Sequence, residues 1–364
     1  MIRYLQIGGL LAAVALAAMA QGAAAEPLAA LPPLPATKPA QVALGRLLFF
    51  DPRLSGDASI SCATCHDPKK GWGDGKALST GYPGSEYFRN SQSIVNAAYY
   101  RRGFWDGRMD GRDLPTLVRD HLTEAHFMQA DGRLLIERMR QVPAYEEMFR
   151  KAMGGEPSYG RILNALAAFV QTVASRNSPL DRQLRGEAGA LSPQAAEGLR
   201  LFQGKAGCIQ CHDGALLSDQ KFHALGVPEH PAVYAEPLRH ITFRRYMKTL
   251  GVPNYDNLRE DVGLFGVTKE PADRGKFRTP ALREVARTAP YMHNGSLASL
   301  DAVVDFYDQG GGAHPNKSPL LRPLGLSGAE KRALVQFLES LSGEPVVVER
   351  PTPPEYKLRT LGKN

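Results

Sequence analysis

Two short stretches, Cys62-Ala-Thr-Cys65-His66 and Cys208-Ile-Gln-Cys211-His212, decide the fold of this chain and contain all four of its cysteines. Each has the form C-x-x-C-H, the pattern at which c-type haem is attached. Two thiols three positions apart each form a thioether with one vinyl group of a porphyrin, and the histidine that follows is held where a ring nitrogen binds iron. The sequence therefore predicts two covalently bound haems, with His66 and His212 as proximal ligands.

Cysteine pairs with this spacing also occur in zinc sites and in disulfide chemistry, so both alternatives stay open at this point. Both pairs are followed at once by a histidine, which favours haem. The start of the chain favours haem too, because it predicts that the protein is exported. Free thiols tend to oxidise in an exported protein. Residues 1–25 contain one charge, Arg3, then an apolar stretch over residues 10–19 and the small residues Ala23-Ala-Ala25. Together these features predict a secretory signal peptide.

We therefore expect a mature chain that begins near Glu26 and lies in the periplasm. The apolar stretch is shorter than the ~20 residues that cross a bilayer, and no later segment reaches that length, so no membrane span is expected after the signal peptide is removed. The formal charge of +7 is mildly basic. Runs of Lys and Arg with interleaved aromatics, which a nucleic-acid surface needs, do not occur, and no nucleic-acid partner is expected.

The sequence that precedes each haem site is repeated. Leu44-Gly-Arg-Leu-Leu-Phe49 precedes the first site and Glu197-Gly-Leu-Arg-Leu-Phe202 the second, and both predict an amphipathic helix that leads into a haem loop. Ser192 followed by Pro193 marks the start of the second helix. Ser327-Gly-Ala-Glu330 is a capping box that begins a further helix, similar to the terminal helix of c-type cytochrome domains.

These helices predict a mainly α-helical fold of two c-type cytochrome domains with long loops. A stretch rich in Gly, Pro and Ser over residues 175–193 separates them. We expect an N-terminal domain over residues 26–180, a C-terminal domain over 181–345 and a C-terminal tail over 346–364. Residues 222–274 show weak periodicity and predict long loops with short elements.

The sixth ligand of each iron decides between electron transfer and reaction with peroxide. Residues 67–120 contain no histidine and one methionine, so an open or water-bound position is expected at the first haem. The next histidines are His121 and His126. Glu124 lies between them, and a carboxylate above the iron could move the peroxide proton; the alternative is an ordinary solvated charge.

Two residues are candidates for the sixth ligand of the second haem. Met292 lies in a turn-like stretch, and after His212 the only other methionine is Met247. Tyr307 lies on the apolar face of a helix predicted over residues 297–307. The pattern alone describes a core tyrosine more often than a ligand, so the choice between Tyr307 and Met292 stays open.

Four further motifs carry a family resemblance over nearly the whole mature chain. They are residues 44–55 (LGRLLFFDPRLS), 104–108 (FWDGR), 277–283 (FRTPALR) and 288–295 (TAPYMHNG). Together with the two C-x-x-C-H sites, they resemble the bacterial di-haem cytochrome c peroxidases and their relative MauG.

The resemblance implies a role for several residues. The first haem would be the high-spin peroxide site, and the second the low-spin haem of electron transfer. Trp105 would lie between the haems and carry electrons, and Glu124 matches the distal glutamate. A calcium ion would lie between the domains, bound by the Asn90 side chain and the backbone carbonyls of Thr288 and Pro290, which are oxygen donors that suit this cation.

Two departures from the peroxidase pattern matter, and so does one departure from MauG. Peroxidases have Met where this chain has Tyr307, whereas MauG has Tyr, a hard anionic donor that favours the higher oxidation states of iron. Tyr82-Pro83 lies where many peroxidases have a histidine that blocks the first iron. Both departures point to the MauG type. The surface tryptophan that MauG has two residues before the second haem's first cysteine is Ala206 here.

The resemblance implies a periplasmic di-haem oxidoreductase of the MauG type. Hydrogen peroxide, or oxygen plus electrons, would oxidise the haems to a two-haem high-valent state, which then oxidises a protein or another donor. A methylamine dehydrogenase precursor, which matures to tryptophan tryptophylquinone, is one such substrate. The alternative is a peroxidase that reduces hydrogen peroxide to water with electrons from a small cytochrome c or cupredoxin. A pure electron carrier with two six-coordinate irons is the third hypothesis.

Overall fold

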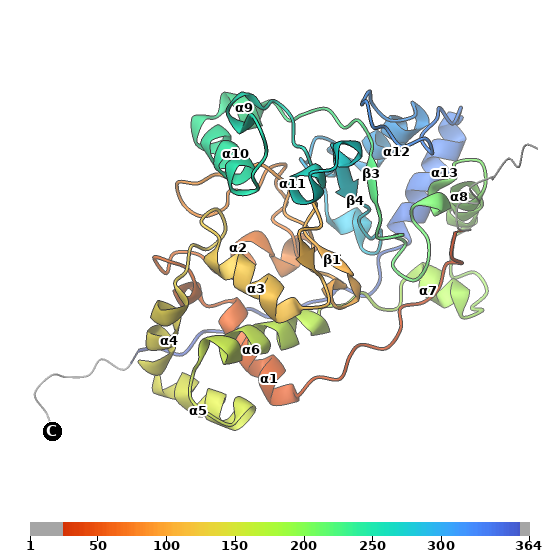
Figure 1. The fold of residues 1–364 in the computed structure, drawn as a ribbon. Coiled ribbons are helices and arrows are strands. Elements are labelled where there is room, and N and C mark those ends of the chain that lie inside the picture. The colour runs from red at the N-terminus through yellow and green to blue at the C-terminus, as the bar shows by residue number, and fades with distance from the viewer. Residues whose placement is uncertain (1–24, 357–364) are drawn as a thin grey trace, which may run out of the picture.

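The computed structural model describes residues 25–356. Most of the predicted signal peptide and the last eight residues of the predicted tail therefore lie outside the described residues. The fold is mainly helical, as predicted, with two small antiparallel strand pairs between the helices (Figure 1). The longer helices are α1 (Pro39–Phe49), α3 (Leu114–Thr123), α4 (Gly132–Arg140), α5 (Pro143–Met153), α6 (Tyr159–Thr172), α8 (Pro193–Gln203), α10 (Pro237–Thr249), α12 (Leu300–Asp308) and α13 (Gly328–Glu339).

The first helix pair is formed by α1 and α6, which lie against each other in the lower half of Figure 1. Gly45 makes the crossing close, since a Cβ atom at this position would lie 1.9 Å from the carbonyl oxygen of Ala165. One turn later, Phe49 packs edge-on against Phe169 with ring centroids 5.2 Å apart. These helices form the first hydrophobic core, which also includes Trp72.

The second helix pair repeats this arrangement and confirms the internal repeat. Helix α8 crosses α13 at Gly198, where a Cβ atom would lie 2.0 Å from the carbonyl oxygen of Ala333. Phe202 then packs against Phe337 with centroids 5.0 Å apart. Each crossing thus has a glycine at the contact and a phenylalanine pair one turn further on, and each lies directly before a C-x-x-C-H site.

The predicted helix starts are confirmed. The Ser192 side chain accepts a hydrogen bond from the backbone N–H of Ala195 at the start of α8. Ser327 and Glu330 form the reciprocal capping box at the start of α13. The helix predicted over residues 297–307 begins later, at Leu300, because the Ser299 side chain caps it.

The prediction of long loops with short elements over residues 222–274 was wrong in one respect. This stretch contains α9 (Ala232–Ala235), the 13-residue α10 and α11 (Phe265–Thr268). Helix α10 buries Arg239 and Thr242 beside Phe243 and Met247, so a search for an apolar stripe does not find it. It packs on Tyr87 and Phe88 and forms a third core over the loop that follows the first haem site.

The strand pairs place residues that the haem sites need. Strands β1 (Arg102–Gly103) and β2 (Met109–Asp110) pair as a short hairpin whose connection contains Trp105. Strands β3 (Phe222–Ala224) and β4 (Lys276–Arg278) also pair, with His223 opposite Phe277. The two strand pairs are joined by a hydrogen bond from the backbone N–H of Arg278 to the carbonyl of Trp105.

The two ends of the described chain lie on opposite units. Near the N-terminus, Glu26 bonds Asp213, next to His212, through a backbone N–H at 2.8 Å. Near the C-terminus, Val346 accepts the indole N–H of Trp72 at 3.1 Å and packs on the first core. Residues 26–38 and the part of the predicted tail up to residue 356 therefore run across the molecule and link the two haem units (Figure 1).

Candidate functional site

The first C-x-x-C-H site lies at α2 (Cys62–Cys65), a single helical turn with a capping box between Ser61 and Thr64. His66 follows this turn, and its Nδ1 donates a hydrogen bond to the carbonyl oxygen of Trp72 at 3.1 Å. Because a carbonyl group only accepts, this bond places the ring proton on Nδ1 and leaves the lone pair of Nε2 free for a metal ion.

The second site has the same arrangement. A 3-10 turn covers Cys208–Gln210, and His212 Nδ1 donates to the carbonyl oxygen of Leu217 at 3.0 Å. Both histidines are thus held as the tautomer that binds a metal through Nε2, which is how proximal haem ligands are oriented.

The alternatives to haem fit less well. All four cysteines are free, and the two pairs belong to different hydrophobic cores, so they cannot share one zinc ion. Burial raises the pKa of the Cys62 and Cys208 thiols to about 12, whereas a zinc site needs thiolates. The donor sets therefore suit thioether attachment of two haems.

A large cavity surrounds His212. Apolar side chains of α8, α12 and α13 form part of its wall, and loop and strand residues form the rest. Arg278 also lines this cavity and is almost completely buried, and its guanidinium lies 4.3 Å from the centroid of the Tyr100 ring. A buried cation needs a counter-charge, yet no described carboxylate pairs with Arg278. A haem propionate would supply that charge, so the cavity fits the group that the motif predicts.

Both candidates for the sixth ligand of the second haem line this cavity. Tyr307 points in from the last turn of α12, and Met292 lies in a turn with a positive φ of 73°. Burial, together with the nearby sulfurs of Cys208 and Cys211, raises the pKa of the Tyr307 phenol well above its usual range. The phenol is therefore neutral unless a metal ion stabilises its anion.

Trp105 lies at the cavity of the second haem site, and its role in electron transfer stays a prediction. Its ring lines the cavity around His212, and its indole N–H donates to the carbonyl oxygen of Asn90 at 3.0 Å. The preceding residue, Phe104, stacks on His121 with centroids 4.8 Å apart. Because the His121 ring in turn lies beside His66, residues 104 and 105 connect the two haem regions.

Glu124 directly follows the last residue of α3, the helix that contains His121. Its carboxylate lies 3.8 Å from Nδ1 of His126, and about a third of its side chain is exposed. Partial burial and the negative charge of Asp120 raise its pKa, a direction that suits a proton-transferring group. The role of Glu124 stays a prediction. His121, not Glu124, is the residue of α3 that lies next to His66.

The three predicted calcium ligands all line the same cavity as Trp105. The side-chain nitrogen of Asn90 donates to the carbonyl oxygen of Lys76 at 2.8 Å, which leaves the Asn90 side-chain oxygen free of any hydrogen bond from a described residue. Thr288 and Pro290 line the cavity beside it. These oxygen donors suit calcium, and the site stays a prediction.

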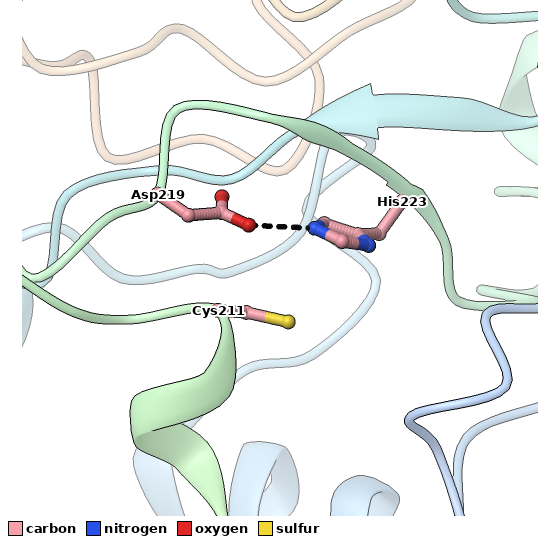
Figure 2. A group of neighbouring side chains, drawn as sticks. All are labelled: Cys211, Asp219 and His223. Carbon is pink, nitrogen blue, oxygen red and sulfur yellow. Dashed lines mark hydrogen bonds and ion pairs between the residues drawn. The ribbon is translucent and has the colours of Figure 1, made fainter. Parts of the chain in front are cut away.

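A histidine–carboxylate pair beside the second haem site was not predicted. Figure 2 shows His223, at β3, directed at Asp219, with Nε2 and Oδ2 2.9 Å apart, and the sulfur of Cys211 close to both. The hydrogen bond to Asp219 raises the pKa of His223 to about 9. With the sulfur of Cys211 in the predicted haem thioether, the group would be a charged pair beside the porphyrin and not a separate metal site. The spacing Asp-x-x-x-His was its only sequence signal.

A buried charge network lies beside Trp105. Arg89 donates to Asp106 at 2.7 Å and to Asp261 at 2.6 Å, and all three side chains are buried. Glu229 lies next to it and accepts hydrogen bonds from the backbone N–H of Asp261 and the hydroxyl of Tyr234. Burial, followed by the negative charge of Asp261, raises the pKa of Glu229 to about 7.

Glu229 is expected to make stability depend on pH. The pKa of Glu229 is higher in the folded protein than the ordinary 4.5. Its contribution to the free energy of unfolding is therefore complete below about pH 4.5 and is lost as the pH rises through about 7. The free energy of unfolding should fall by on the order of 2–3 kcal/mol over that range. Urea unfolding at pH 5 and pH 8 should show a smaller difference in Glu229→Gln than in the wild type; equal differences would contradict the assignment.

No helix within residues 25–356 is long and apolar enough to cross a membrane.

A profile of the family described as "Di-haem cytochrome c peroxidase" matches residues 39–189. The chain is 51% identical to "Cytochrome-c peroxidase IdrP2" of Denitromonas iodatirespirans over 93% of its length and 91% of the relative's. It is 37% identical to "Methylamine utilization protein MauG" of Methylorubrum extorquens, over 87% and 82% of the two chains.

The fold is also similar to a solved structure, that of "a MauG-like protein associated with microbial copper homeostasis". The TM-score is 0.72 at 30% identity, and the match covers 87% of this chain and 93% of the other. Similarity over most of the length to both relatives, and to this structure, agrees with two haem units in one oxidoreductase. The chain therefore belongs to the di-haem cytochrome c peroxidase family, which includes MauG.

Proposed function

We propose that this protein is a periplasmic enzyme that reduces hydrogen peroxide at its first haem and draws electrons through its second, with Tyr307 as the sixth ligand of the second iron. The single observation that carries the proposal is the place of Tyr307, which lines the cavity that contains His212. An anionic oxygen ligand stabilises oxidised iron, so such an enzyme can hold two oxidising equivalents while it waits for a donor, as the MauG type does.

Two bound haems would supply iron that exchanges electrons with peroxide and with the donor. The residues of this chain do the rest. His66 and His212 hold the haems through Nε2, and the Trp105 ring provides an aromatic stepping point between them. Glu124 would take a proton from one peroxide oxygen and return it to the other, which leaves as water. Asn90, Thr288 and Pro290 would bind calcium next to Trp105 and fix its position.

The overall reaction takes two electrons and two protons for each hydrogen peroxide that becomes two molecules of water. Two classes of donor can supply the electrons. A small cytochrome c or cupredoxin is favoured by the name "cytochrome-c peroxidase" of a relative that is 51% identical. A protein substrate such as a methylamine dehydrogenase precursor is less favoured, because Ala206 replaces the tryptophan through which MauG takes electrons.

The test is a steady-state assay of the purified holoenzyme with hydrogen peroxide and a reduced small c-type cytochrome or cupredoxin as donors. The proposal expects peroxide-dependent oxidation of two donor molecules for each peroxide consumed. Absence of donor oxidation, together with unchanged haem spectra on addition of peroxide, would contradict it and would favour a pure electron carrier.

Glu124→Gln should slow the reaction with peroxide by about tenfold or more. General acid–base groups commonly contribute more than this, but water can partly replace the Glu124 carboxylate, because about a third of this side chain is exposed. Stopped-flow absorbance of the oxidised enzyme mixed with peroxide measures the rate constant, and the haem content of the variant should equal that of the wild type. A rate within twofold of wild type would make Glu124 an ordinary surface charge.

A further inference from the structure

The C-terminal tail joins the second haem unit to the loop beside the first haem site (Figure 1). Helix α13, which belongs to the second core, ends at Glu339. The second unit still holds the chain at Gly343, whose backbone N–H donates to Glu284 at 2.7 Å and whose carbonyl accepts from Arg287 at 2.9 Å. Val346 follows and packs on the first core. The tail is therefore fixed on both units.

A hydrogen bond strengthens the contact between the tail and the first core. The indole N–H of Trp72 donates to the carbonyl oxygen of Val346 at 3.1 Å. Trp72 is 1% exposed, and its ring packs against Phe49 and Phe169. An indole nitrogen can only donate a hydrogen bond, and a buried donor without an acceptor is costly. The tail therefore supplies the acceptor that Trp72 needs inside the first core.

Trp72 in turn holds the predicted proximal ligand of the first haem. Its backbone carbonyl accepts a hydrogen bond from Nδ1 of His66 at 3.1 Å and a longer one from the backbone N–H of Ile94 at 3.3 Å. The backbone φ of Trp72 is 62°, in the left-handed region that a bulky residue seldom adopts. A return to an ordinary φ would move the carbonyl, so the contacts that hold the indole also hold the bond to His66.

The bond between His66 and Trp72 affects the iron that His66 would bind. A carbonyl oxygen that accepts the Nδ1 proton makes the imidazole a stronger electron donor at Nε2. Hydrogen bonds of this outer shell are one of the means by which a protein sets the potential of a haem, and a stronger donor favours ferric over ferrous iron. Loss of the bond should therefore raise the reduction potential of the first haem.

We propose that the C-terminal tail is a positioning element for His66. Through Val346 and Trp72 it keeps the Nδ1 hydrogen bond in place, and so it holds the reduction potential of the first haem low. This inference rests on the haem at His66 that the proposed function also uses. In that function a low potential keeps the first haem ferric, which is the state in which the oxidised enzyme meets peroxide.

Spectroelectrochemical titration of the holoenzyme tests the proposal. Trp72→Phe keeps an aromatic ring in the first core but removes the indole N–H. It should shift the ferric–ferrous equilibrium of the first haem about tenfold toward ferrous iron, a rise of about 59 mV for one electron. The second haem is an internal control, because His212 bonds Leu217 instead, and it should keep its wild-type potential. An unchanged first haem potential in Trp72→Phe, at full haem content, would overturn the proposal.

Two variants of the tail itself make the result specific. Val346→Asp places a carboxylate where the side chain packs on the first core, so the tail should leave and the potential of the first haem should rise as in Trp72→Phe. Val347→Asp is the matched control, because Val347 is 77% exposed, and it should keep the wild-type potential. A wild-type potential in Val346→Asp, or an equal rise in both tail variants, would contradict a positioning role for the tail.

The same samples separate this inference from the proposed function. If Trp72→Phe and Val346→Asp raise the potential of the first haem but peroxide leaves both haem spectra of the wild type unchanged, the role of the tail is supported and the peroxidase function fails. If the wild type oxidises donor with peroxide while both variants keep the wild-type potential, the function is supported and the role of the tail fails.

Discussion

Tyr307→Met is expected to raise the reduction potential of the second haem and to abolish the long-lived oxidised state that forms after reaction with peroxide. A thioether sulfur favours reduced iron, whereas a tyrosinate oxygen favours oxidised iron. Axial ligands tune haem potentials over a range of about 0.8 V, and a rise of about 120 mV changes a one-electron equilibrium about a hundredfold. The lifetime of the oxidised state should therefore fall about a hundredfold or more.

Potentiometric titration and stopped-flow absorbance measure the two effects. Met292→Leu is the matched control, because Met292 lines the same cavity and is the other candidate ligand. It should leave both the potential and the lifetime close to wild type. If Met292→Leu changes the potential of the second haem and Tyr307→Met does not, Met292 is the ligand, and the proposed storage of two oxidising equivalents loses its basis.

Gly198→Ala is expected to destabilise the second haem unit by about 3 kcal/mol or more, at the upper end of the cost of overpacking. The added Cβ would lie 2.0 Å from the carbonyl oxygen of Ala333 and 2.7 Å from Cβ of Phe337. These atoms belong to the backbone and the first side-chain carbon of α13, so no rotamer change relieves the contact. Helices α8 and α13 must separate, and this opens the core that carries the second haem loop.

Gly160→Ala is the control for this variant. Gly160 lies in α6, and a Cβ atom there meets nothing within 4 Å. Alanine should therefore stabilise that helix by about 0.5–1 kcal/mol. Denaturant unfolding of the holoenzymes, followed by circular dichroism, compares the variants. If Gly198→Ala lowers the free energy of unfolding by less than about 1 kcal/mol, the α8–α13 crossing is not as tight as described.

The sequence predicted the parts of this molecule that depend on local patterns. Neighbouring residues are enough to predict the C-x-x-C-H sites, the capped starts of α8 and α13 and the repeated glycine before each site. The structure confirms the capped starts and the glycine repeat. The glycine repeat had a physical cause that the sequence did not show, namely that a second helix passes within contact distance of the glycine backbone.

The parts that the sequence did not predict depend on contacts between distant segments. Helix α10 has no apolar stripe, because Arg239 is buried by its bond to the Glu86 carboxylate and not by hydrophobic packing. The sequence shows that His121 is the first histidine after His66. Only the rotation of α3 and its packing on Phe104 place it next to His66. The pair of His223 and Asp219 lies beside the second haem because the loop before β3 folds back on Cys211.

Addition of one equivalent of hydrogen peroxide to the fully oxidised holoenzyme, without any donor, tests the central claim most directly. The central claim is that two haem units act as one oxidant through Trp105, with Tyr307 at the second iron. Absorbance of both haems should change together and persist for seconds or longer, and both changes should disappear when two equivalents of a reduced donor are added. A change confined to the first haem, with the second haem unaltered throughout, would contradict it.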